Sequence, residues 1–122
     1  MNEDSEEVYK EYKNEAEEIL KNMRSSCESL KERSDKNALA EIMRCSHKIK
    51  GVAGMMDYSH IEELAGEMEL VSKLIVEGKI QLKPEIVSIL LESVNLLAKY
   101  IEKDFDERDT TLLEKLRKLR NV

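Results

Sequence analysis

Apolar residues recur every three or four positions along most of the chain, which is the spacing of one face of an α-helix. This pattern predicts five helices, over about residues 5–33, 36–56, 60–77, 84–103 and 110–120. No segment alternates between apolar and polar residues as a half-buried strand would. We therefore expect an all-α fold, an antiparallel up-down four-helix bundle with a short fifth helix at its C-terminal end.

Residues typical of helix boundaries stand where the apolar pattern breaks. Ser34 and Asp35 offer an N-cap to the second helix. Ser59 is followed three residues later by Glu62, the spacing of a capping box, which favours a helix start there. Gly78 follows the last apolar position of the third helix, where glycine commonly ends a helix. These signals support the division into separate helices.

The composition indicates one domain over residues 1–122 whose partners are proteins. The chain has 122 residues, and 38% of them are charged, which suits long solvated helices around a modest core. The net charge of −6 argues against binding to nucleic acid or to an anionic membrane surface, since both require a surplus of lysine and arginine. No apolar run approaches the ~20 residues that span a bilayer, and the first residues are acidic, unlike a secretory signal. We expect a cytoplasmic protein with no membrane insertion.

The two cysteines, Cys27 and Cys45, are too few and too far apart for a disulfide framework or a zinc site. We expect two reduced, half-buried thiols. The sequence predicts no metal site and no cofactor held by this chain.

The second helix contains the stretch SHKIKGVAGMMDY, in which a histidine is followed by two glycines. A glycine costs a helix interior about 1 kcal/mol relative to alanine. Three residues follow His47 at helical spacing: Lys50 after three positions, Gly51 after four and Gly54 after seven. They therefore share with His47 one stripe of the helix, distinct from the apolar stripe. We interpret Gly51 and Gly54, with Arg44, as a docking face where a partner approaches the histidine.

Counting from the next turn predicts a partner for the histidine. His47 lies eleven residues before Tyr58 and Glu69 lies eleven after it, so an antiparallel hairpin folded about Tyr58 brings them face to face. A carboxylate that accepts a hydrogen bond from Nδ1–H would leave Nε2 as the free lone pair and make it more nucleophilic. Lys50, one turn away, could offer positive charge to a phosphoryl oxygen.

These residues also carry a resemblance to a known family. The stretch AEIMRCSHKIKGVAGMMDY resembles the H-x-x-K-G signature of histidine-phosphotransfer (HPt) domains, most closely the N-terminal phosphotransfer domains of chemotaxis histidine kinases of the CheA type. The likeness extends through NEAEEILKNM, GMMDYSHIEELAGEMELV and EGKIQLKPEIVSILLESVNLL, and covers nearly the whole chain. Two positions depart from the family pattern: Gly66 stands where many members have a second histidine, and Asp57 where a turn glycine is common.

The resemblance implies a histidine phosphocarrier in two-component chemotaxis signalling. His47 would be the phosphorylated residue, Glu69 the partner of its Nδ1, and Lys50 and Gly51 the motif residues beside it. An ATP-binding kinase domain, with its own ATP and Mg²⁺, would phosphorylate His47, and a receiver-domain response regulator would take the phosphoryl group onto an aspartate. The chain alone would then have no catalytic activity, and the isolated domain would be a monomer.

Other functions remain open at this point. The chain could be a free-standing HPt protein of a multistep phosphorelay instead of one domain of a larger kinase. A dimerising phosphoacceptor domain of a sensor kinase would normally place an acidic residue directly after the histidine, where this chain has Lys48. A di-iron bundle would need a Glu-x-x-His motif on each of two helices, and only Asp57-x-x-His60 comes close. A helical adaptor without phosphate chemistry is the remaining alternative.

Overall fold

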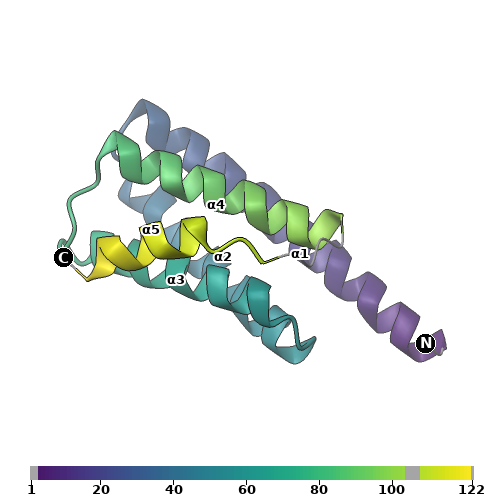
Figure 1. Cartoon of the computed structure of the whole chain (residues 1–122). Coiled ribbons are helices and arrows are strands. Elements are labelled where there is room, and N and C mark those ends of the chain that lie inside the picture. Colours follow the sequence, from purple (N-terminus) through teal and green to yellow (C-terminus); the bar gives the residue numbers. More distant parts are fainter. Residues whose placement is uncertain (1–2, 104–107, 122) are drawn as a thin grey trace.

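The computed structural model describes residues 3–103 and 108–121, and its regular structure within those ranges is entirely helical. The predicted all-α bundle of four long helices and one short helix is confirmed (Figure 1). The bounds differ from the expected ones by at most two residues, as is common at fraying helix ends. The helices are α1 (Glu3–Glu32), α2 (Lys36–Met55), α3 (Ser59–Val76), α4 (Pro84–Glu102) and α5 (Thr111–Arg120).

The four long helices pack around one core, with α1 against α2 and α4, and α3 against α2 and α4. The short α5 lies on α3 and α4 (Figure 1). With 30 residues, α1 is about 45 Å long at 1.5 Å per residue, and its N-terminal part projects beyond the rest of the bundle (Figure 1). The α2–α3 hairpin, which carries the predicted histidine, therefore belongs to the compact part of the molecule.

The core consists of the apolar stripes that define the helices in the sequence. Its largest fully buried side chains include Met23, Ile42, Leu64, Met68 and Leu97. Ser46 and Ser93 are two of the polar residues buried in this core, and each hydroxyl donates to the carbonyl oxygen four residues earlier at 2.7 Å. A buried hydroxyl satisfied within its own helix is tolerated in an apolar core.

The α2–α3 turn is closed by backbone hydrogen bonds that the sequence pattern does not show. The N–H of Tyr58 donates to the carbonyl of Ala53 at 2.9 Å, and Asp57 adopts a left-handed conformation with φ of 63°. This is the Schellman arrangement, in which aspartate is one of the few non-glycine residues that fit. Tyr58 then becomes the N-cap of α3 without a side-chain hydrogen bond, so the predicted capping box of Ser59 and Glu62 is wrong. Ser59 is already the first helical residue, which leaves Glu62 available for other contacts.

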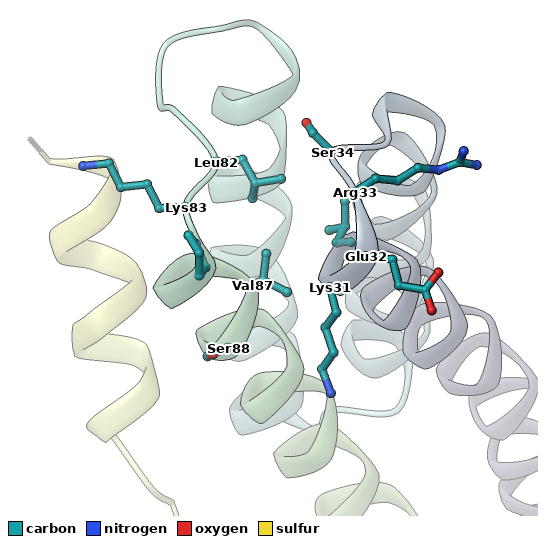
Figure 2. A pocket seen from close by; sticks show the side chains of 10 residues that line it. Lys31, Glu32, Arg33, Ser34, Leu82, Lys83, Val87 and Ser88 are labelled. Atoms are coloured by element: carbon teal, nitrogen blue, oxygen red, sulfur yellow. The ribbon is translucent and has the colours of Figure 1, made fainter.

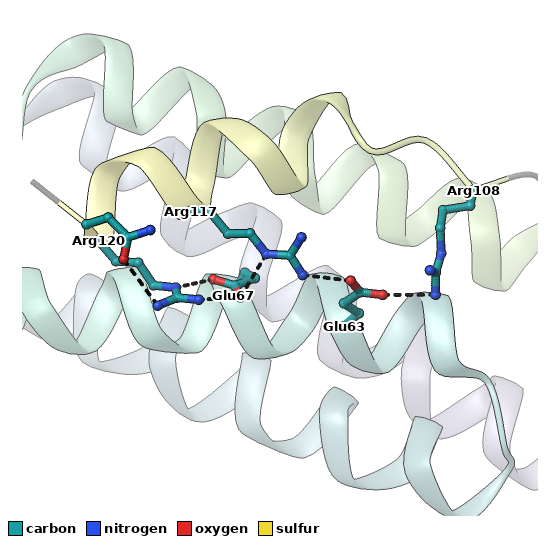
Figure 3. A network of polar contacts seen from close by, with 6 residues as sticks. Glu63, Glu67, Arg108, Arg117 and Arg120 are labelled. Atoms are coloured by element: carbon teal, nitrogen blue, oxygen red, sulfur yellow. Dashed lines mark hydrogen bonds and ion pairs between the residues drawn. The ribbon is translucent and has the colours of Figure 1, made fainter.

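A network of arginines and glutamates fixes α5 to α3 (Figure 3). Arg117 donates to Glu63 at 2.7 Å and to Glu67 at 3.3 Å, and Arg120 donates to Glu67 at 2.6 Å. Arg108 pairs with Glu63 at 2.9 Å. Burial alone would raise the pKa of the Glu67 carboxyl, but the hydrogen bonds from Arg120 and Arg117 outweigh it and lower that pKa. Because Glu63 and Glu67 turn toward α5, they leave the side of α3 that faces α2 to other residues.

Candidate functional site

The α2–α3 hairpin brings His47 and Glu69 into contact. Nδ1 of His47 lies 2.7 Å from Oε2 of Glu69, as counting from Tyr58 predicts. The His47 side chain is 71% exposed, whereas that of Glu69 is 21% exposed. The Glu69 side chain is thus mostly shielded from solvent, whereas the imidazole is mostly exposed and has one nitrogen engaged.

This contact determines which nitrogen of His47 carries the proton. An ionised carboxylate can only accept hydrogen bonds, so Nδ1 must donate to Glu69. In the neutral imidazole the other nitrogen, Nε2, then holds the lone pair. In its neutral form the imidazole therefore presents Nε2 as a free lone pair, on a ring that is 71% exposed and has a carboxylate at its other nitrogen.

Lys50 lies on the same carboxylate. Its Nζ is 3.5 Å from Oε1 of Glu69, so the two oxygens of Glu69 serve different partners, His47 and Lys50. The aliphatic stem of Lys50 passes over Gly66 on α3, where a Cβ atom would lie 3.6 Å from Cδ of Lys50. The Lys50 side chain is 47% exposed, so its ammonium group remains within reach of a group that approaches His47.

A shallow hollow opens beside the histidine on the surface of α2. We call it the His47 hollow, and it is lined by His47, Lys50, Gly51, Gly54, Met55 and Glu62. A Cβ atom at Gly51 would meet nothing within 4 Å, so this glycine borders open space as the docking-face interpretation requires. Met55 is 87% exposed, an unusual position for a large apolar side chain.

At Gly54 the structure differs from the sequence interpretation. The carboxylate of Glu62 on α3 lies directly over this glycine, and a Cβ atom there would collide with Oε2 of Glu62. Gly54 therefore makes room for a side chain of this chain, in addition to any room it leaves for a partner. Sequence reasoning missed Glu62 and Met55 as members of the site. Met55 follows Gly51 by four positions, and this helical spacing was the available signal for the methionine. Nothing in the sequence indicated that the Glu62 carboxylate lies over Gly54.

Arg44, the third residue assigned to the docking face, is exposed one turn before His47 and pairs with Glu41 at 2.6 Å. This hydrogen bond, with a second from Cys45, lowers the pKa of the Glu41 carboxyl. Cys45 is buried, and burial together with the neighbouring Glu41 raises the pKa of its thiol to about 11. Cys45 is therefore a protonated core side chain beneath the site and supplies no nucleophile to it.

Another hollow lies at the opposite end of the bundle from the α2–α3 turn, between the end of α1 and the start of α4 (Figure 2). Leu82 and Val87 face this gap, whereas Lys83 and Arg33 extend away from it (Figure 2). Its polar groups do not converge on a ligand position, and it contains none of the predicted site residues.

Residues 3–103 and 108–121 contain neither a candidate metal site nor a helix that could span a membrane. In those ranges, no three histidine, cysteine, aspartate or glutamate side chains are grouped so that they could hold a metal ion. Nor does any helix there combine the length and apolar character needed to cross a bilayer.

Comparisons with known proteins relate this chain to a family. The chain is 28% identical over 117 residues to the chemotaxis protein CheA of Salmonella typhimurium, an alignment that covers 93% of this chain but 17% of that protein. Its fold is similar to a crystal structure of the phosphorylated P1 domain of CheA3 in complex with CheY6 from R. sphaeroides, with a TM-score of 0.79 and 23% identity, covering 94% of this chain and 93% of that one. The family model described as the Hpt domain matches residues 7–118. The chain therefore belongs to the Hpt domain family.

Proposed function

We propose that this chain is a histidine phosphocarrier in which Nε2 of His47 accepts a phosphoryl group and then passes it to an aspartate of a receiver domain. The observation that carries the proposal is the 2.7 Å contact between Nδ1 of His47 and the Glu69 carboxylate on a ring that is 71% exposed. An exposed nucleophile with a defined tautomer is what a phosphoacceptor needs, because the donor and the receiver must each reach it.

The contacts of His47 support direct attack of Nε2 on ATP, with the proton retained on Nδ1. The lone pair of Nε2 attacks the γ-phosphorus of ATP, the bond from phosphorus to the bridging oxygen breaks, and ADP leaves with that electron pair. The ring keeps its Nδ1 proton and becomes positively charged as the N–P bond forms. Glu69 accepts the hydrogen bond from Nδ1, so its negative charge stabilises the positive charge that develops on the ring.

Lys50 and Glu69 have separate tasks in this proposal. Glu69 does not touch the phosphoryl group and acts through the imidazole, so it is a positioning residue. Lys50 has a 47% exposed side chain one turn from His47, and its ammonium group balances charge on the phosphoryl oxygens. When the receiver aspartate attacks phosphorus, the N–P bond breaks and its electrons return to Nε2, which restores the starting state.

The catalytic groups for both steps belong to the partners. The kinase domain supplies ATP, Mg²⁺ and their binding site, and the receiver supplies the aspartate and its metal. This bundle contributes a rigid helix that presents Nε2 in a fixed direction, which lowers the entropic cost of in-line attack.

We place the domain in chemotaxis signalling, as the phosphoacceptor domain of a CheA-type histidine kinase. The relatives support this assignment, because the matched curated protein is a chemotaxis protein and the matched P1 domain was solved with CheY6. The chain spans about a sixth of the length of that curated relative, so the kinase and regulator partners are part of the proposal. A free-standing phosphorelay protein is the second candidate, and it uses the same residues in the same roles.

The test is labelling with ATP that carries ³²P in the γ position, in the presence of a CheA-type kinase domain. We expect label that is stable in alkali and lost in acid, as phosphohistidine is, and that moves to a chemotaxis receiver domain when one is added. His47→Gln should fold normally and take up no label. Persistent labelling of that variant would assign the phosphoryl group to another residue, and no labelling of the wild type would leave an adaptor bundle as the function.

A further inference from the structure

Among the residues that the structure describes, Glu62 is the charged group in the His47 hollow that has no counter-charge. The hollow is lined by one basic and one acidic side chain, Lys50 and Glu62, and Lys50 pairs with Glu69. Glu62 is exposed and has no hydrogen bond or ion pair with any residue in the described part of the chain. An unpaired carboxylate next to a phosphoacceptor is unexpected, because it would repel the phosphoryl group.

The position of Glu62 is built into the hairpin. Its carboxylate lies over Gly54, where any other residue would place a Cβ atom in collision with Oε2. Gly54 thus costs α2 some helical stability and in return leaves space for a negative charge within the hollow. Glu62 also lines a second shallow depression on α3, next to Gly66 and Leu70.

We propose that Glu62 is a docking residue that receives a lysine or arginine side chain of the receiver domain that takes the phosphoryl group. This inference rests on the proposed function of His47. A partner cation that enters the hollow would lie between the Glu62 carboxylate and the phosphoryl group on Nε2, so it would be attracted by both. Only the phosphorylated domain offers both charges, because a phosphoryl group adds nearly two negative charges at neutral pH.

The receiver, and not the kinase domain, is the source of that cation, because only the receiver meets the domain in its phosphorylated form. The kinase binds the unphosphorylated domain, so at encounter a cation of the kinase would meet the Glu62 carboxylate but no phosphoryl group on His47. The exposed Met55 at the edge of the hollow offers the apolar contact that a protein surface, as opposed to a free ion, would cover. Glu62 therefore contributes to the choice of receiver and to the rate of encounter.

The experiment measures transfer from the phosphorylated domain to the chemotaxis receiver that dephosphorylates the wild type fastest, over a range of receiver concentrations. The variants are Glu62→Gln and Glu62→Lys, and the matched controls are Glu92→Gln and Glu92→Lys, which change an exposed carboxylate on α4. We expect Glu62→Gln to raise the KM for the receiver about threefold and Glu62→Lys about tenfold at low salt, in the range of an exposed ion pair and its reversal. The rate at saturation should be unchanged, and the differences should shrink at 0.5 M NaCl.

A double-mutant cycle tests the role of Gly54. Gly54→Ala places a Cβ atom where Oε2 of Glu62 lies, and only the end of a flexible side chain must move, so the bundle stays folded. It should raise the KM about threefold in the wild type and have no further effect in Glu62→Gln. If Gly54→Ala raises the KM equally in the wild type and in Glu62→Gln, Gly54 does not act by making room for the Glu62 carboxylate, and it only leaves space for the partner.

The outcomes separate this inference from the proposed function. If the wild type transfers its label but Glu62→Lys and Glu92→Lys have the same KM, the docking role of Glu62 is refuted while the function of His47 stands. If Glu62→Lys raises the KM for the kinase domain instead of the receiver, the choice of partner is refuted. If the wild type takes up no label, the proposed function itself fails.

Discussion

Replacing Glu69 by alanine should slow phosphorylation of His47 without unfolding the bundle. The substitution removes the acceptor 2.7 Å from Nδ1, after which the tautomer with the proton on Nε2 can compete and block the nucleophile. It also removes the partner of Lys50 at 3.5 Å, so that ammonium group is no longer held beside the histidine. Glu69 is half-buried and does not belong to the apolar core, so the free energy of unfolding should change little.

The size of the effect follows from the geometry. A hydrogen bond to a charged group contributes about 1.5–3 kcal/mol. His47 is 71% exposed, so water can partly replace the carboxylate at Nδ1, and we take about 1 kcal/mol as the net loss at the transition state. At about 1.4 kcal/mol for each factor of ten, this corresponds to a phosphorylation rate roughly five times lower. Glu69→Gln keeps the length of the side chain but loses its charge, so it should fall between the wild type and alanine.

The assay is single-turnover phosphorylation by a kinase domain at saturating ATP, with Glu92→Ala as a control on α4. A companion measurement of the ¹⁵N chemical shifts of His47 reports the tautomer directly. We expect the proton on Nδ1 in the wild type and a mixture of tautomers in Glu69→Ala. A rate within twofold of the wild type, or an unchanged tautomer, would refute the positioning role of Glu69.

Two further predictions concern the α5 network and the docking face. The fold lowers the pKa of Glu67, so the stability from its ionised form is present above the ordinary value of 4.5 and is lost as the pH falls below it. Glu67→Gln should therefore have a lower urea midpoint than the wild type at pH 7, and this difference should shrink as the pH is lowered below 4.5; equal midpoints at pH 7 would contradict the network's contribution. Gly51→Leu should stabilise the bundle by about 0.5–1 kcal/mol, because leucine favours helix and its Cβ meets open space. It should also raise the KM for the receiver, and an unchanged KM would remove Gly51 from the docking face.

The fold could be predicted from the sequence because each helix carries an apolar stripe at helical spacing. The same regularity located Glu69 opposite His47, since residues equally distant from a hairpin turn lie side by side in antiparallel helices. That inference needed only the rise per residue and the position of Tyr58. Side-chain conformations did not enter it.

The rest of the site depends on features that periodicity does not encode. The capping-box spacing assigned Glu62 to a helix start, but the left-handed Asp57 moves the cap to Tyr58, and the freed carboxylate lies over Gly54. A local sequence rule was thus overridden by the backbone hydrogen bonds of the turn. The exposure of Met55 depends likewise on where α2 ends, which no local pattern indicates.

The network between α3 and α5 could not be predicted from local sequence patterns either, because it joins residues far apart in the chain. Its arginines follow α4 in the chain, and its glutamates lie on α3, more than forty residues earlier. The sequence predicted a short fifth helix with an apolar side but did not predict which helix it would cover. That choice depends on the packing of whole helices, in which the acidic residues of α3 meet the basic residues of α5 (Figure 3).

The central claim is that Nε2 of His47 is the phosphoryl acceptor. The most direct test is an NMR measurement on the ¹⁵N-labelled domain after phosphorylation, in which the ¹⁵N–³¹P coupling identifies the nitrogen bonded to phosphorus. The contact between Nδ1 and Glu69 predicts a coupling at Nε2 of His47, with the proton retained on Nδ1. A coupling at Nδ1 of His47, or at either ring nitrogen of His60, would contradict the account.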